Sequence, residues 1–415
     1  MDNGVEEYGM RARTTLGRLA GAAAIGALVV SLTTGTSGAA TITVHRSAPD
    51  PVALRASIAG LPSAEITSAV VLVDGDGGRW SGTSGTGDPA TGRPVKADGR
   101  FRIGSISKVF TATVLLQLAA EHRVDLDGTV QQYLPGTLPA EYPPVTVRQL
   151  LNHTSGLPSG GDLTAPDGSS DDGSAAWFAA HAADHWTARQ VAESLAGQPM
   201  RFAPGTAQQY NGVNYYLAGL LVERITGRSF AAEVTDRVLR PLGLHHTSAP
   251  AATDTALPDP TAHAVLAVPR PDGGTGLADV TRQSPWPWAE GGMVSTAPDL
   301  DRFLSALLRG ELLPPAQQAE LFAVPDVPNF HNQNCDIGPT TGRACFSTGL
   351  MRFTPAPGIE LWGKTGSRPG YTSAVFATRD ASRELVLSFT PTSRQGAPFA
   401  AQYRVAAAAF DLPAL

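Results

Sequence analysis

Ser105 and Lys108 lie three residues apart, directly before an apolar run with helical spacing at residues 109–118. Residues three apart on a helix share a face, so the lysine amine can reach the serine hydroxyl. A serine is a poor nucleophile until a neighbouring base takes its proton, and a lysine shielded from water can be that base. The pair therefore predicts acyl transfer through a serine nucleophile.

Lysine is scarce in this chain, and that scarcity supports a chemical role for Lys108. Only Lys96, Lys108 and Lys364 are lysines among 31 basic residues, which leaves 28 arginines (31 minus 3). Arginine keeps its proton in proteins, whereas lysine can lose it when it is desolvated. Lys108 and Lys364 both lie in motifs, while Lys96 lies in a polar stretch typical of a solvated charge.

A second group of reactive side chains lies at Lys364-Thr365-Gly366. It ends a predicted strand, where a cation, a hydroxyl and open backbone groups can line a substrate site. Tyr210, from the middle of the chain, offers a second proton-transfer group. Ser-x-x-Lys alone is a weak pattern, but its combination with Lys-Thr-Gly is typical of class A β-lactamases and penicillin-binding proteins.

Strand patterns occur at both ends of the chain, on either side of a long helical middle. Residues 69–74 are rich in β-branched residues, and a Gly-Asp-Gly-Gly turn predicts a hairpin with residues 79–82. Four more strand candidates precede a closing helix at 397–410, and they lie at residues 346–353, 359–365, 372–378 and 384–390. The order predicts an α+β fold, in which helices flank an antiparallel sheet built from both chain ends.

We expect one domain at residues 41–415, in which an inserted, mostly helical lobe lies beside the sheet and the active site lies between them. The sheet lobe is expected at about 50–115 and 290–415, and the helical lobe at about 116–289. The formal net charge of −6 gives no support for nucleic-acid binding, which needs a basic patch.

Residues 1–40 have the pattern of an export signal. Arg11, Arg13 and Arg18 precede a small apolar segment at 19–32, and small residues at 37–40 offer a cleavage site near Ala40. The alternative is a membrane anchor, but the apolar segment is shorter than the ~20 residues that span a bilayer. We therefore expect a secreted protein without a stable membrane anchor after processing.

Cys335 and Cys345 are the only cysteines. In an exported chain, such a pair most simply forms a disulfide. The alternative is a metal site, which needs more ligands than the sequence places nearby. We therefore expect no metal.

Two further residues near the expected cleft have alternative interpretations. His153 can be proposed as a catalytic base, but its place before a Ser-Gly-Leu-Pro turn favours a structural role in the loop. Trp288 lies in a proline-interrupted loop, where it either lines the cleft or packs beneath the loop.

The motifs together resemble those of the serine β-lactamase-related family, which includes secreted D-alanyl-D-alanine carboxypeptidases, class C β-lactamases and related esterases. The resemblance covers nearly all of the mature chain and is greatest to the soluble, secreted D-Ala-D-Ala peptidases. It implies a β-lactamase/DD-peptidase-like fold. The residues that carry it are the segments 101–105, 150–157, 204–206, 291–296 and 363–370.

The resemblance implies a role for each reactive residue. Ser105 would form an acyl-enzyme, while Lys108 and Tyr210 would share the proton transfers. The backbone N–H groups of Ser105 and Ser367 would form the oxyanion hole. Lys364 would support the proton network and the substrate carboxylate, and no cofactor is expected. Further substrate contacts are expected from Thr365, Gly366, Asn211, Arg352 and Trp288.

Two positions depart from the family pattern. The family's middle motif is usually Tyr-x-Asn, but Gly212 stands where its asparagine is expected. Either Asn211 or Asn214 takes over the hydrogen bond of that amide, or the substrate's amide is held differently. The related carboxypeptidases bind the terminal carboxylate with an arginine on the preceding strand. Met351 falls at that position here, and Arg352 would point to the opposite face of a regular strand.

The expected function is that of a secreted serine-type D-alanyl-D-alanine carboxypeptidase, acting on peptidoglycan stem peptides and acylated by β-lactams. The alternatives are a β-lactamase or an esterase/D-aminopeptidase-like hydrolase, which share the nucleophilic chemistry. A non-catalytic penicillin-sensing domain is less favoured, because Ser105, Lys108, Tyr210 and Lys364 are all present. We expect a monomer.

Overall fold

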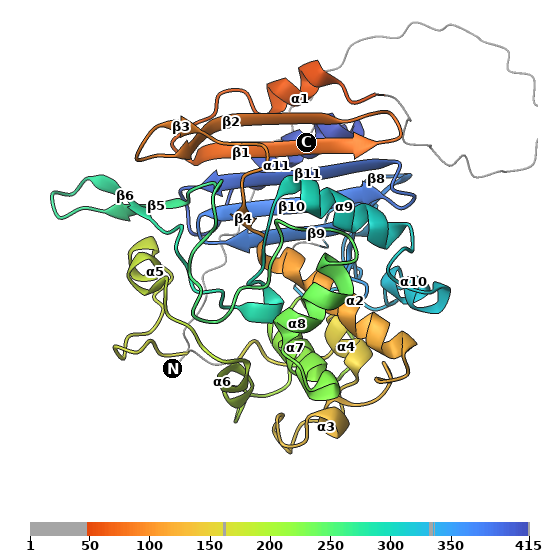
Figure 1. Cartoon of the computed structure of the whole chain (residues 1–415). Coiled ribbons are helices and arrows are strands. Elements are labelled where there is room, and N and C mark those ends of the chain that lie inside the picture. Colours follow the sequence, from red (N-terminus) through yellow and green to blue (C-terminus); the bar gives the residue numbers. More distant parts are fainter. Residues whose placement is uncertain (1–47, 161–162, 332–334, 336, 414–415) are drawn as a thin grey trace, which may run out of the picture. The chain divides into compact units, whose positions relative to one another are not determined.

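A seven-stranded antiparallel sheet forms the centre of the computed structural model, which describes residues 48–160, 163–331, 335 and 337–413 (Figure 1). The strand order is β3-β2-β1-β11-β10-β9-β8, so both ends of the chain contribute neighbouring strands, as predicted. The strands are β1 (Ile66–Gly75), β2 (Trp80–Asp88), β3 (Arg93–Pro94), β8 (Met351–Ala356), β9 (Ile359–Arg368), β10 (Tyr371–Thr378) and β11 (Arg383–Pro391). The expected export signal lies outside the described residues.

Strand β1 is buried on both faces because its side chains alternate between two apolar cores. Val70 and Leu72 belong to the larger core, which the sheet shares with the helical middle of the chain. Val71 and Val73 belong to a smaller core on the opposite face. The two-residue period of a strand produces this division, and it explains why the sequence shows an unbroken apolar run.

Helices cover both faces of the sheet (Figure 1). α1 (Pro51–Ser57) and α11 (Phe399–Phe410) contact each other and cover the smaller core. α9 (Ala297–Leu308) packs on the other face, against β1, β10 and β11. The remaining helices are α2 (Ser107–Ala120), α3 (Val130–Tyr133), α4 (Val147–Leu151), α5 (Ala175–His181), α6 (Ala188–Glu193), α7 (Val213–Thr226), α8 (Phe230–Val234) and α10 (Pro315–Leu321).

Two parts of the fold differ from the sequence-based expectation. β8 begins at Met351 rather than at 346, because a tight turn in which Ser347 N donates to Leu350 O occupies the first half of the predicted strand. The region expected to be helical also contains a hairpin, β5 (Val265–Pro269) and β6 (Thr275–Asp279). The glycine-rich turn at 273–274 closes this hairpin. Two short strands, β4 (Phe101–Arg102) and β7 (Val294–Ser295), pair beside the active site.

Cys335 and Cys345 form a disulfide with a Cα–Cα distance of 5.3 Å, as the sequence predicted. Both cysteines are buried in the smaller core, beside Phe346. Within the described ranges, no helix combines the length and the apolar character that a membrane span needs.

Candidate active site

Two glycines allow the loop that carries Ser105 to lie directly against the end of β9. Gly104 has a positive φ of 51°, and a Cβ atom on it would lie 2.5 Å from the backbone nitrogen of Ser367. A Cβ atom on Gly366 would lie 2.0 Å from the carbonyl oxygen of Ile103. Only glycine fits at these contacts. The backbones of the two predicted oxyanion-hole residues, Ser105 and Ser367, are thereby brought close together.

Lys108 lies on the first turn of α2, where its amine reaches Ser105. Its Nζ donates to Ser105 Oγ at 3.1 Å and to the carbonyl oxygen of Glu290 at 2.9 Å, and the side chain has no exposed surface. Burial lowers the pKa of Lys108, although the nearby Glu290 carboxylate acts in the opposite direction. A lowered pKa favours the neutral amine, which can accept the serine proton.

Glu290 is the residue of this site that sequence reasoning missed. Its carboxylate forms an ion pair with Lys108, and Oε1 would lie 3.2 Å from a Cβ atom built on Gly212. The carboxylate thus lies beside the position where the family pattern has an asparagine side chain. No spacing rule connects Glu290 with Ser105. Two features of the sequence point to Glu290: the missing side chain at Gly212, and the Gly291-Gly292 pair that directly follows Glu290.

Tyr210 lies between the two lysines and packs against the rings of His153 and Phe346. Its ring centroid lies 5.0 Å from Lys108 Nζ and 4.7 Å from Lys364 Nζ. Burial raises the pKa of the phenol well above its usual value, and Glu290 adds to that effect. The hydroxyl is buried and has no hydrogen-bond partner in the described structure, and the nearby Ser105 acts to lower its pKa. A neutral phenol in this place can pass a proton between Ser105 and a leaving group.

His153 supports Tyr210 rather than acting as a base. Its ring centroid lies 4.6 Å from that of Tyr210, and Nδ1 accepts a hydrogen bond of 3.2 Å from Asn211 N. Burial, together with the two neighbouring lysines, holds the pKa of His153 well below its usual value. The structure therefore agrees with the structural role favoured from the sequence.

Lys364 projects from β9 toward the same point as Tyr210. Its Nζ donates to the carbonyl oxygen of Thr365 at 3.0 Å. Burial and the nearby charge of Lys108 lower the pKa of Lys364 to about 7. This second lysine can therefore gain or lose a proton near neutral pH, which is the range useful for acid–base catalysis.

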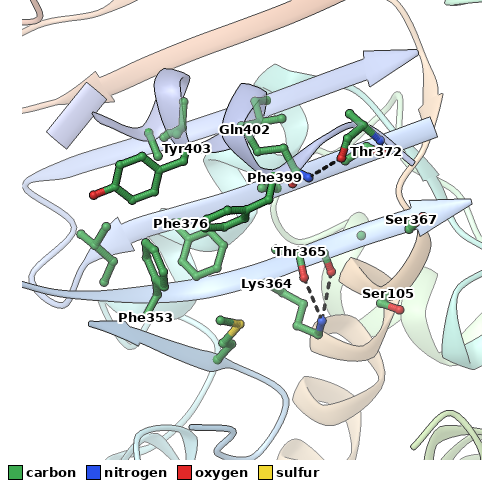
Figure 2. Close-up of a pocket in the computed structure, with 18 of the residues that line it drawn as sticks. Ser105, Phe353, Lys364, Thr365, Ser367, Thr372, Phe376, Phe399, Gln402 and Tyr403 are labelled. Carbon is green, nitrogen blue, oxygen red and sulfur yellow. Dashed lines mark hydrogen bonds between the residues drawn. The ribbon is translucent and has the colours of Figure 1, made fainter. Parts of the chain in front are cut away.

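A pocket of about 660 Å³ opens at the nucleophile and extends across β9 toward α11 (Figure 2). Ser105, Tyr210 and Lys364 line its catalytic end. Thr365, Gly366 and Ser367 form the adjoining wall. The structure thus brings together residues from the turn before α2, the helical middle and β9.

Asn211 does not line this pocket, which corrects the expected substrate contact. Its Nδ2 donates to the carbonyl oxygens of Leu157 at 2.8 Å and Pro158 at 3.1 Å, while Oδ1 accepts from Val213 N. The amide is therefore fully used in holding the loop before α7. Asn214, the other candidate, is also buried, and its Oδ1 accepts a hydrogen bond from Ser155.

Two further predicted substrate contacts, Arg352 and Trp288, also lie outside the pocket. Met351 lines it instead of Arg352, because successive side chains on β8 face opposite sides of the sheet. Arg352 lies 3.9 Å from Glu360 on that opposite side. Trp288 packs beneath its loop, where a Cβ atom on Gly219 would lie 2.5 Å from its ring.

The arrangement contains the groups that acyl transfer requires. It combines a serine nucleophile, two lysines of lowered pKa, a neutral phenol and adjacent backbone N–H groups. In the described part of the chain, no group of three or more His, Cys, Asp or Glu side chains could hold a metal ion.

This fold and site define the class of the protein, a serine hydrolase. A family model described as Beta-lactamase matches residues 54–410, and the chain therefore belongs to that family. Penicillin-binding protein 4 of Amycolatopsis lactamdurans is 35% identical over 180 residues, which are 43% of this chain. The match spans only 42% of that relative's own length.

Solved structures match over a larger share of the chain. A D-stereospecific amidohydrolase from Streptomyces sp. is 31% identical with a TM-score of 0.71, over 87% of this chain and 99% of that one. The D-amino acid amidase of Ochrobactrum anthropi SV3, in complex with D-phenylalanine, is 25% identical with a TM-score of 0.65. That match covers 82% of this chain and 91% of the amidase.

Proposed function

We propose that this protein is a secreted serine hydrolase that cleaves amide bonds adjacent to D-amino acids through an acyl-enzyme on Ser105. The contact between Lys108 Nζ and Ser105 Oγ at 3.1 Å carries the proposal, because it joins a nucleophile to a base of lowered pKa. The similarity to a D-stereospecific amidohydrolase and a D-amino acid amidase supports the choice of substrate.

In the proposed reaction, Ser105 Oγ attacks the substrate carbonyl while Lys108 takes the serine proton. Tyr210 then delivers a proton to the departing amine, and the C–N bond breaks. Water hydrolyses the resulting ester with the same groups acting in reverse. The backbone N–H groups of Ser105 and Ser367 stabilise the oxyanion in both steps.

A D-alanyl-D-alanine carboxypeptidase acting on peptidoglycan stem peptides, the expectation from the sequence, is the second candidate. The cationic Lys364 beside Thr365 favours it, because these groups suit a terminal carboxylate. Met351 argues against it, since an apolar side chain occupies the position where the related carboxypeptidases have an arginine. We therefore rank the D-amino acid amidase activity first.

A substrate panel tests this ranking. D-phenylalanine amide, its L enantiomer, a peptide ending in D-Ala-D-Ala, the β-lactam nitrocefin and p-nitrophenyl acetate would be compared by kcat/KM. We expect the D-amide to be cleaved at least tenfold faster than the L-amide and the D-Ala-D-Ala peptide. Faster release of D-alanine would favour the carboxypeptidase, and rapid turnover of nitrocefin would favour a β-lactamase.

Secretion and a monomeric state are parts of the same proposal. Expression of the full chain in a secreting bacterial host should yield a mature protein whose N-terminus lies near residue 41. Retention of residues 1–40 in the cell fraction would contradict export. Light scattering of the purified mature protein should give the mass of one chain.

A further inference from the structure

The pocket at Ser105 has two chemically different ends. The catalytic end carries Lys364, which is the only charged side chain that lines the pocket in the described structure. Toward α11 the polar side chains of Thr372 and Gln402 are bonded to the backbone of Ala397. The other end lies between the sheet and α11. Its walls there come from Leu361, Phe376 and Leu387 on the strands and from Phe399, Tyr403 and Ala406 on α11. Figure 2 shows Phe376 and Phe353 on the sheet side, facing Tyr403 and Phe399.

This apolar end is larger than the smallest substrates require. The whole pocket has a volume of about 660 Å³, within the range typical of sites for drug-sized ligands. The methyl group of a D-alanine residue would leave most of that volume unfilled. Phe399 stands at the first turn of α11 and is 49% exposed, so an apolar ring borders the solvent side.

The apolar end of the pocket is continuous with the end that carries Ser105. We infer that this apolar end, beneath α11, binds an uncharged apolar group of the substrate, aliphatic or aromatic. The inference rests on the proposed function and specifies its substrate class. An apolar group placed there removes hydrocarbon surface from water without leaving a charge unpaired, because the walls carry none. The amide bond of the same molecule can then reach Ser105.

Two substrate series test the inference on the full chain. One extends the side chain of the D-aminoacyl amide from D-alanine to D-norleucine, and the other extends the N-alkyl group of D-alanine amides from methyl to hexyl. We expect kcat/KM to rise by about fourfold per added methylene in one series, from the transfer free energy of a buried CH₂. The series that rises identifies which side of the scissile bond enters the pocket.

Variants of α11 separate this pocket from other apolar surfaces. Ala406→Trp fills the apolar end of the pocket and should reduce the increase in kcat/KM to less than twofold per methylene. Ala408→Trp adds the same side chain on the same helix at a position that does not line the pocket, so it should leave the increase unchanged. Near-UV circular dichroism and the thermal midpoint check that both variants fold.

Binding without turnover provides an independent readout. Full-length Ser105→Ala should bind hexanamide at least tenfold more tightly than acetamide in calorimetry, and Ala406→Trp in the same background should remove the difference. An active wild-type enzyme whose rates are flat in both series would overturn the apolar pocket and leave the proposed function intact. No cleavage of any amide, with hexanamide still preferred in calorimetry, would instead overturn the proposed function alone.

Discussion

The carboxylate of Glu290 lies beside the backbone of Gly212, so that a Cβ atom on Gly212 would be 3.2 Å from Oε1 and 3.4 Å from Cδ. The same carboxylate forms the ion pair with Lys108. An acid therefore contacts the candidate base in the region where the family pattern supplies an amide. Because a carboxylate acts on the proton affinity of a lysine and an amide does not, this exchange affects catalysis and can be tested directly.

Glu290→Gln is expected to move the acid limb of the pH profile of kcat/KM to lower pH. Lys108 must be neutral to accept the serine proton, and the Glu290 charge raises the pKa of Lys108 against the lowering effect of burial. Removal of that charge lets the amine lose its proton at lower pH. An unmoved limb with an equal loss of rate at every pH would mean that Glu290 only fills space.

Gly212→Asn is expected to reduce kcat/KM by about 10²-fold, because the new side chain displaces Glu290 and with it Lys108. Adding Glu290→Ala should restore part of the activity by making room for the amide. Gly227→Asn, at the other end of α7, is the matched control. A side chain there meets no atom within 4 Å, and Asn tolerates the left-handed conformation of this cap. If the double variant is no more active than Gly212→Asn, the Glu290 carboxylate does not occupy the place of the family's asparagine amide.

Lys364→His is expected to keep more activity than Lys364→Gln but with its optimum moved to lower pH, because the burial and the Lys108 charge that lower the pKa of Lys364 would lower that of an imidazole too. The pKa of Lys364 is lowered to about 7 by burial and by Lys108. Lys364→Gln cannot carry a proton and should lose about 10²-fold or more. If the histidine and glutamine variants are equally impaired, the protonation of residue 364 has no part in the reaction.

The buried carboxyl of Asp301 should make the protein less stable as the pH rises from about 4 to about 7. Burial raises its pKa to about 7, and nearby Asp74 acts in the same direction. The unfolded value is about 4, so this contribution to stability is complete below pH 4 and is lost as the pH rises through 7. Thermal midpoints of Asp301→Asn should vary less over that range. Asp76→Asn, at a neighbouring exposed position, should behave as wild type.

Much of the fold could be predicted because its signals are local. The β-branched run of β1 and its glycine turn indicated the hairpin, and strong turns marked off the C-terminal strands. The start of β8 and the β5–β6 hairpin were missed. In both places a turn closes through backbone hydrogen bonds, Ser347 N to Leu350 O and Arg270 N to Gly274 O, that composition does not reveal.

In the candidate site, too, residues in local sequence motifs were found, whereas residues brought together only by folding were missed. Ser105, Lys108 and Lys364 lie in two short motifs, which together with the scarcity of lysine were enough to find them. Glu290 comes next to Lys108 only when the loop before β7 folds against α2, and no sequence period records that contact. The prediction of Asn211 as a substrate contact was wrong because its amide forms hydrogen bonds within its own loop, which the sequence does not show.

The proposed mechanism requires that Ser105 is the acylated nucleophile. Intact-mass analysis after reaction with a fluorescent penicillin tests it most directly. The wild-type protein should gain the mass of one penicilloyl group, and peptide mapping should place that group on Ser105. Ser105→Ala should gain none. Labelling that persists in Ser105→Ala, or that maps to another residue, would contradict the assignment of Ser105 as the nucleophile.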